Sequence, residues 1–204
     1  MDCLYLILAG GPGRRLMPLT ESTPKPLLRF GTRGRVMDFT LNNILATNGG
    51  DALAAVNGHA DDIDRYLRVY WSGAFSSAGK NLAVVAPKDR DSLAFHGPAE
   101  AVHKALAGLD ELPELVAILP SDLVYKMDYR PLVDFHRQNR KALTVAAFPD
   151  DSGPEAGHGI LGVNKDGVVE TMAISPPEKD APAKTGGVSA GNGKGPRLKS
   201  AGVY

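Results

Sequence analysis

The sequence has few of the features that mark secreted, membrane-bound or nucleic-acid-binding proteins. Its single cysteine, Cys3, excludes an intramolecular disulfide, and its 23 basic residues balance its 23 acidic residues. No apolar stretch approaches the ~20 residues that a bilayer span needs. The amino terminus also has no basic region ahead of its short apolar run. We therefore expect a cytoplasmic protein without a nucleic-acid or membrane partner.

Several familiar catalytic and nucleotide-binding motifs are also missing. The five histidines are scattered without metal-ligand spacing, which argues against a zinc site. No GxSxG occurs, and no Gly-Lys-Ser/Thr ends a Walker loop. The dinucleotide fingerprint GxGxxG fails because Leu16 stands where its third glycine belongs.

The most informative stretch that is present, residues 4–16, reads LYLILAGGPGRRL. Its apolar run is typical of a strand buried on both faces of a parallel sheet. Gly10, Gly11 and Gly13 let the backbone reverse and approach a ligand closely. Backbone N–H groups in such a turn, with an arginine beside them, can seat a polyphosphate. The stretch indicates nucleotide handling; the alternative is an ordinary turn with solvated arginines.

Lys25 follows this loop and stands between Pro24 and Pro26. The two prolines fix φ on either side, so we expect the segment to be extended and the lysine side chain to have a restricted orientation. A lysine held in this way suits a phosphate, whereas the alternative is a surface lysine in a proline-rich loop.

Apolar runs of strand length alternate with amphipathic segments of helical length along the chain. Strands are predicted at residues 4–8, 52–56, 81–85, 115–119, 142–147, 160–164 and 168–173, and helices at 37–46, 60–68, 100–107 and 131–139. This alternation predicts an α/β fold, Rossmann-like, with a mostly parallel sheet and helices on both faces. Ligands are then expected at the carboxyl ends of the strands.

Asp122 follows the buried strand predicted at residues 115–119, after Pro120 and Ser121. A carboxylate at that strand end faces the same crevice as the glycine loop. Mg²⁺ prefers one or two protein carboxylates together with phosphate and water oxygens. We therefore expect Asp122 to be a magnesium ligand, the alternative being a helix-capping aspartate.

Taken together, a series of short motifs resembles the sugar nucleotidyltransferases, and within them the ADP-glucose pyrophosphorylases, or glucose-1-phosphate adenylyltransferases. The motifs run in the family's order from the first strand to the last residue: LAGGPGRRL from Leu8, LT from Leu19, KP from Lys25, FG from Phe30, RVMDFTLNN from Arg35, GPAEAV from Gly97, LPSDLVYKMDY from Leu119, HGILGV from His158 and SAGVY from Ser200. The combination is specific, although no single motif is. The resemblance implies the nucleotide-diphospho-sugar transferase type of the α/β fold.

The resemblance also implies transfer of a nucleotidyl group from ATP to glucose 1-phosphate with Mg²⁺, giving ADP-glucose and pyrophosphate in glycogen or starch synthesis. Arg15 and Lys25 would face the β- and γ-phosphates, and Asp122 would hold the metal. The implied nucleotide-binding residues are Leu8, Ala9, Gly10, Gly11, Gly13, Asn57 and Gly97, and the implied sugar-phosphate contacts are Gly159, Glu178, Lys179 and Ser200.

Two departures from the family pattern keep other functions open. Asn57 stands where the family has a glutamine, which leaves another nucleoside triphosphate or sugar phosphate possible. Glu178 and Lys179 are displaced past two prolines. A non-catalytic nucleotide-binding relative or a regulatory subunit is the alternative to an enzyme.

At 204 residues the chain suits a single domain. Residues 176–197 are rich in Gly, Pro, Ala and Lys and are expected to form a mobile loop within it. By the resemblance, the domain over residues 1–204 is incomplete at its C-terminus, since the family's chains continue to a second metal-binding aspartate and a β-helix. A full-length form is expected to be a homo- or hetero-oligomer.

Overall fold

The computed structural model describes residues 3–11, 13–87, 95–149, 159–174 and 197–204. The chain divides into two compact units, Met1–Lys141 and Ala142–Tyr204. The expectation of a single domain over residues 1–204 stays a prediction.

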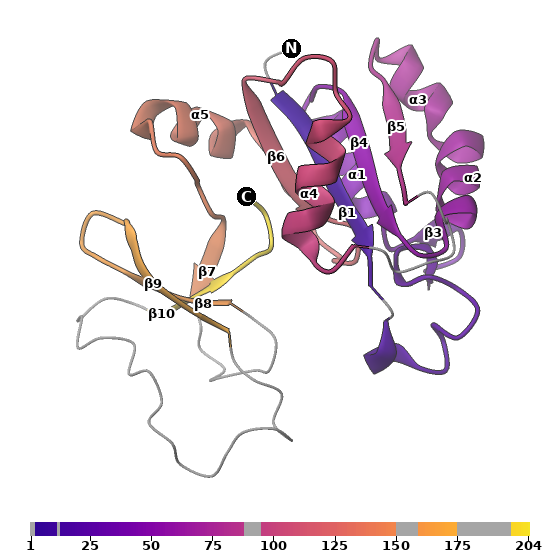
Figure 1. Cartoon of the computed structure of the whole chain (residues 1–204), viewed down its shortest axis with the longest axis horizontal. Coiled ribbons are helices and arrows are strands. Elements are labelled where there is room, and N and C mark those ends of the chain that lie inside the picture. Colours follow the sequence, from indigo (N-terminus) through magenta and orange to yellow (C-terminus); the bar gives the residue numbers. More distant parts are fainter. Residues whose placement is uncertain (1–2, 12, 88–94, 150–158, 175–196) are drawn as a thin grey trace. The chain divides into compact units, whose positions relative to one another are not determined.

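The first unit is built on a four-stranded parallel sheet in the order β5-β4-β1-β6 (Figure 1). Its strands are β1 (Cys3–Gly10), β4 (Ala52–Asn57), β5 (Leu82–Val85) and β6 (Leu115–Pro120). Its helices are α1 (Asp38–Ala46), α2 (Ala60–Tyr70), α3 (Ser72–Ser77), α4 (Pro98–Ala107) and α5 (Arg130–Asn139). All three strand pairings are parallel. The predicted α/β fold is confirmed here, and its predicted strands and helices agree to within a few residues at their ends.

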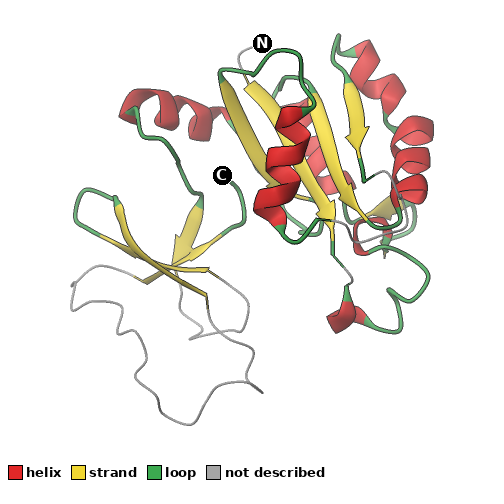
Figure 2. Ribbon diagram, viewed as in Figure 1, coloured by secondary structure: helices red, strands yellow, loops and turns green. Residues whose placement is uncertain are grey.

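Helices cover both faces of this sheet (Figure 2). Leu4 and Leu6 of β1 form a buried cluster with Ala101 and Ala105 of α4 on one face. In Figure 1, α4 crosses the front of the sheet and α1 lies behind it. Because side chains alternate along a strand, Tyr5 points to the face opposite Leu4. Its ring packs against that of Tyr129, with the ring centroids 5.6 Å apart.

Local signals fix where α4 begins. Pro98 takes the first helical position, where a missing N–H removes no hydrogen bond. The Glu100 carboxylate reaches back and accepts a hydrogen bond from the His96 N–H at 2.8 Å. This contact gives Glu100 a structural role at the helix start.

The loop before α1 is fastened to α2 by a carboxylate. Asp38 accepts hydrogen bonds from the Tyr66 hydroxyl at 2.8 Å and the Trp71 indole N–H at 3.0 Å. The Arg35 N–H donates to the same carboxylate at 2.7 Å. Burial and, secondarily, the hydrogen bond to Asp38 raise the pKa of Tyr66 to about 12. Asp38 thereby fixes the start of α1.

The second unit is an antiparallel sheet in the order β7-β10-β8-β9. Its strands are β7 (Ala147–Pro149), β8 (Gly159–Val163), β9 (Val169–Ile174) and β10 (Arg197–Ser200). The mostly parallel pairing predicted for the chain does not extend to these strands, and the strand predicted at residues 142–147 is found at 147–149. Between β8 and β9 there is only a tight turn, in which the Asn164 N–H donates to the Val168 carbonyl and Gly167 has φ +74°. Such a short connection joins antiparallel strands, because a parallel pair needs a crossover.

Smaller elements complete the described structure. Residues 13–36 contain two 3₁₀ turns, η1 (Arg14–Leu16) and η2 (Lys25–Leu27), and a two-stranded hairpin of β2 (Arg29–Phe30) and β3 (Gly34–Arg35). The sequence patterns predicted neither the hairpin nor the short helix α3. No helix in the described ranges has the length and apolar character needed to cross a membrane.

Candidate functional site

The carboxyl ends of three neighbouring strands gather most of the predicted residues. Gly10 at the end of β1 pairs in register with Asn57 of β4, and Leu8 pairs with Pro120 of β6. Buried Ser121 follows Pro120, and its hydroxyl donates to the Leu8 carbonyl at 2.6 Å. The glycine loop, Asn57 and Asp122 therefore follow adjacent strand ends, as the sequence predicts.

The glycine loop uses conformations that other residues rarely adopt. Gly11 and Gly13 have φ values of +126° and +59°. A Cβ on Gly13 would lie 2.8 Å from the Thr20 Cγ2, and a Cβ on Gly10 would lie 2.7 Å from the Asn57 Cβ. The Thr20 hydroxyl closes the loop by donating to the Gly13 carbonyl at 2.9 Å. Pro12 lies outside the described residues.

The two arginines follow Gly13 in the single turn η1. Both Arg14 and Arg15 are exposed. A cation placed directly after a turn of glycines is available to a polyanion bound against the loop.

Lys25 and Asp122 meet although 97 positions separate them in the sequence. The Lys25 Nζ lies 2.7 Å from the Asp122 Oδ2, and the two side chains are 35% and 38% exposed. Lys25 opens the turn η2, whose Pro26 and Leu27 are buried and anchor it. The prediction of an extended segment was wrong at Lys25, which begins a 3₁₀ turn. Pro26 fits in this turn because the first positions of a helical turn need no backbone N–H donor. The lysine is nevertheless held in one place.

The donor set around Asp122 fits magnesium better than zinc. Among the residues that the structure describes, no three His, Cys, Asp or Glu side chains are close enough to hold a metal ion. Mg²⁺ is commonly held by one or two carboxylates, with phosphate and water completing its octahedron. A partly exposed carboxylate at a strand end next to the glycine loop matches that requirement.

Asn57 contacts the backbone that precedes α4. Its amide Nδ2 donates to the Phe95 carbonyl at 2.9 Å, and its Oδ1 accepts from the Phe95 N–H at 3.2 Å. Gly97, two residues further on, is extended and has no atom within 4 Å of a built Cβ. The structure thus places Asn57 against the segment that carries Gly97, with both of its amide atoms engaged.

Two of the predicted sugar-phosphate residues lie together in the second unit. Gly159 begins β8 and Ser200 ends the adjacent strand β10, and a Cβ on Gly159 would be 3.6 Å from the Ser200 Cβ. The Ser200 Oγ accepts from the Gly202 N–H at 3.1 Å and lies 3.0 Å from the Tyr204 hydroxyl oxygen. Glu178 and Lys179 lie outside the described residues.

Sequence patterns missed a set of buried polar side chains on α1 and at its C-terminal cap, namely Thr40, Asn43 and Thr47. They contact the chain on either side of Asp122. Their spacing of three and four residues, next to the apolar positions Leu41 and Ile44, is a signal that could have revealed a second buried face.

A parallel α/β sheet with a glycine loop, a lysine and an aspartate at its carboxyl edge defines an α/β domain suited to binding phosphate groups. The family profile described as "Nucleotidyl transferase" matches residues 4–204, and the chain belongs to that family.

Several known proteins that are similar to this chain are named glucose-1-phosphate adenylyltransferases. A glucose-1-phosphate adenylyltransferase 2 of Vibrio parahaemolyticus is 32% identical over 177 residues, which cover 86% of this chain and 44% of that protein. Glucose-1-phosphate adenylyltransferases of Rhodopirellula baltica and Thermodesulfovibrio yellowstonii are 35% and 36% identical over 79% and 72% of this chain. The matches cover 37% and 36% of those two proteins. The chain therefore spans less than half the length of these relatives.

Proposed function

We propose that this chain transfers the adenylyl group of ATP to glucose 1-phosphate, giving ADP-glucose and pyrophosphate, as a step of glycogen or starch synthesis. The family assignment and the name shared by its relatives support the reaction. The observation that carries the proposal is the meeting of Lys25 and Asp122 at the strand ends beside the glycine loop. At this position the lysine ammonium could bind a polyphosphate, and the aspartate carboxylate could bind its divalent metal ion.

The reaction needs alignment and charge neutralisation, because the attacking phosphate is already ionised. One of its oxygens bonds to the α-phosphorus of ATP while the bond from that phosphorus to the oxygen bridging to the β-phosphate breaks. Pyrophosphate leaves with the electron pair of that bond. In our proposal Arg15 and Lys25 contact the β- and γ-phosphates and stabilise the negative charge that grows on the leaving group.

Backbone groups and small residues hold the remaining parts of the substrates in this proposal. The backbone of residues 8–11 and Gly13 approaches the phosphates and ribose, and Asn57 and Gly97 lie on the base side. Gly159, Ser200, Glu178 and Lys179 are the proposed sugar-phosphate contacts. Mg²⁺, held by Asp122, would supply further neutralisation of phosphate charge.

Pyrophosphate release tests this proposal directly. The chain is incubated with glucose 1-phosphate, Mg²⁺ and one of ATP, GTP, UTP or CTP, and pyrophosphate and the sugar nucleotide are measured. We expect release with ATP and loss of release when EDTA removes the metal. Release with a different nucleotide would correct the substrate. If the chain binds a nucleotide but no mixture releases pyrophosphate, the proposed enzyme activity is wrong and the chain is a non-catalytic nucleotide-binding protein.

A further inference from the structure

The segment that carries Asp122, residues 121–129, has no helix or strand of its own. Its backbone N–H and C=O groups therefore lack the partners that a sheet or helix provides. Since buried backbone polar groups are almost always paired, other parts of the protein must satisfy them. For the Tyr125 carbonyl and for the Met127 and Tyr129 N–H groups, these partners are side chains of α1 and its C-terminal cap.

Three polar side chains line one face of α1 at spacings of three and four residues. Thr40, Asn43 and Thr47 are 0%, 5% and 3% exposed. Residues with this spacing lie above one another on a helix. A buried hydroxyl or amide is costly unless it is hydrogen-bonded, so this face requires a polar partner.

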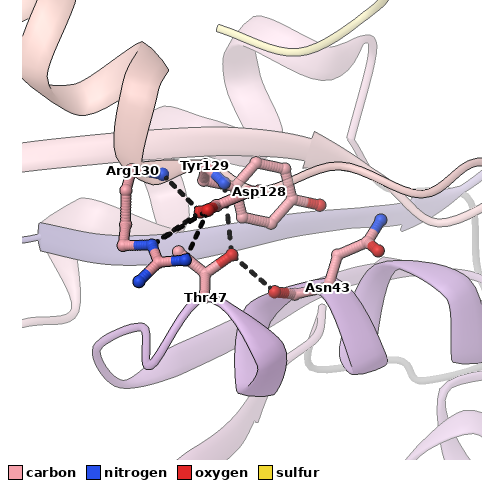
Figure 3. A network of polar contacts seen from close by, with 5 residues as sticks. All are labelled: Asn43, Thr47, Asp128, Tyr129 and Arg130. Carbon is pink, nitrogen blue, oxygen red and sulfur yellow. Dashed lines mark hydrogen bonds and ion pairs between the residues drawn. The ribbon is translucent and has the colours of Figure 1, made fainter.

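Asn43 and Thr47 bind alternate residues of the segment, and Figure 3 shows the part of this contact that Thr47 makes. The Asn43 amide donates to the Tyr125 carbonyl at 3.3 Å and accepts from the Met127 N–H at 3.2 Å. The Thr47 hydroxyl accepts from the Tyr129 N–H at 3.1 Å and donates to the Asn43 carbonyl at 2.7 Å. Residues 125, 127 and 129 thus present backbone groups to the helix, as alternate residues of a strand would. The side chains of Asn43 and Thr47 make the hydrogen bonds that a neighbouring strand would otherwise make.

Thr40 extends this contact to the end of β6. Its hydroxyl lies 2.6 Å from the Pro120 carbonyl oxygen, to which it donates, and 3.2 Å from the Tyr125 hydroxyl. The Tyr125 hydroxyl is 2.6 Å from that of fully buried Tyr129. Asp122 therefore lies between two fixed points, with β1 and α1 holding residues 120–121 and α1 holding residues 125–129.

The far end of the segment also carries an ion pair. The Arg130 guanidinium donates to both oxygens of Asp128, and this contact holds the pKa of the Asp128 carboxyl below its usual range. Both side chains are exposed, so the pair contributes little to positioning.

We propose that Asn43, with Thr40 and Thr47, positions the Asp122 carboxylate for metal binding by holding the backbone on either side of it. None of the three touches Lys25 or Asp122 in the contacts above, so each is a positioning residue. The proposal rests on the proposed function, in which Asp122 is the metal ligand. Displacement of a ligand by about 1 Å can cost a hundredfold in rate, so small shifts of this segment matter.

Mn²⁺ binding in the presence of α,β-methylene ATP tests the proposal without turnover. Asn43→Ala leaves the Tyr125 carbonyl and the Met127 N–H without their partner, and we expect about tenfold weaker Mn²⁺ binding. Asn42→Ala is the matched control, because Asn42 is an exposed neighbour whose amide donates within the helix, to the Asp38 carbonyl. It should bind Mn²⁺ as the unmodified chain does. Equal affinities of the two variants would overturn the proposal.

Two substitutions of Thr40 distinguish a role in positioning Asp122 from a role in the stability of the fold alone. Thr40→Val keeps the side-chain shape and removes the hydroxyl, whereas Thr40→Ser keeps the hydroxyl. We expect Thr40→Val to lower kcat about tenfold with the KM for ATP nearly unchanged, and Thr40→Ser to retain kcat. Equal kcat values for the two variants would contradict positioning. Thermal unfolding of each variant confirms that the folded protein is compared.

Two further measurements keep the two proposals distinguishable. Hydrogen exchange at the Met127 amide should accelerate in Asn43→Ala and stay slow in Asn42→Ala, and this readout needs no metal. Unchanged exchange overturns the positioning role. Unchanged Mn²⁺ affinity in Asp122→Asn overturns the metal assignment of the proposed function instead.

Discussion

Two irregular segments follow neighbouring strands of the parallel sheet, and they are held in different ways. The described residues of the loop over residues 10–20 are mostly exposed, with positive φ at Gly11 and Gly13 and a side-chain bond from Thr20 back to Gly13. The segment over residues 121–129 is held by the buried polar face of α1. The first depends on local backbone conformation and the second on tertiary contacts. Substitutions in the two segments should therefore act by different mechanisms.

Asp122→Asn should have the largest effect on activity. We expect at least about a hundredfold loss of pyrophosphate release, because a neutral amide is a poor magnesium ligand. The fold should persist, since both Asp122 and its partner Lys25 are partly exposed. Asp128→Asn is the control on the same segment, because Asp128 pairs with exposed Arg130, and it should stay within about twofold. Near-equal rates for the two variants would contradict the metal assignment.

Gly13→Ala should damage the glycine loop through local strain. Alanine at φ +59° costs about 1–2 kcal/mol, and its Cβ would meet the Thr20 Cγ2 at 2.8 Å. We expect about tenfold weaker ATP binding by calorimetry. Adding Thr20→Ser removes that methyl group while keeping the hydroxyl, and it should recover part of the loss. Gly31→Ala, also at positive φ but with no atom within 4 Å, serves as a control for strain outside the loop. No recovery in the double variant would exclude the clash as the cause.

Lys25→Ala should change metal and nucleotide binding in opposite directions. Removal of the ammonium takes away a phosphate contact, so ATP should bind about tenfold more weakly. The Asp122 carboxylate also loses its partner and becomes free for a cation. Mn²⁺ alone should bind more tightly, by no more than about fivefold, because the pair is one-third exposed. Weaker binding of both ligands would show that the lysine supports the carboxylate rather than competing for it.

How far the sequence predicted this arrangement depends on the kind of contact involved. Buried apolar runs and the residues after them placed Gly10, Asn57 and Asp122 at adjacent strand ends, because parallel strands meet at one edge. The same runs could not give strand direction in the second unit, where the length of each connection decides the pairing. From the sequence alone, the polar residues Asn43 and Thr47 would be placed on the surface. Their burial follows from hydrogen bonds to the backbone of an irregular segment far away in the sequence, which no local pattern specifies.

Asn57→Ala offers a finer comparison, because it tests whether the base is recognised by a side chain or by backbone. Both polar atoms of the Asn57 amide bond to Phe95, so the variant should loosen residues 95–97 rather than remove a base contact. Loss of these bonds should weaken binding by about fivefold. We expect the same factor for ATP and GTP, since a displaced backbone serves all bases alike, and calorimetry with each nucleotide measures it. Glu100→Gln, which can still accept from the His96 N–H, is the matched control and should keep normal affinities. A loss confined to ATP would instead assign Asn57 to adenine recognition, with the Phe95 contact giving way when the nucleotide binds.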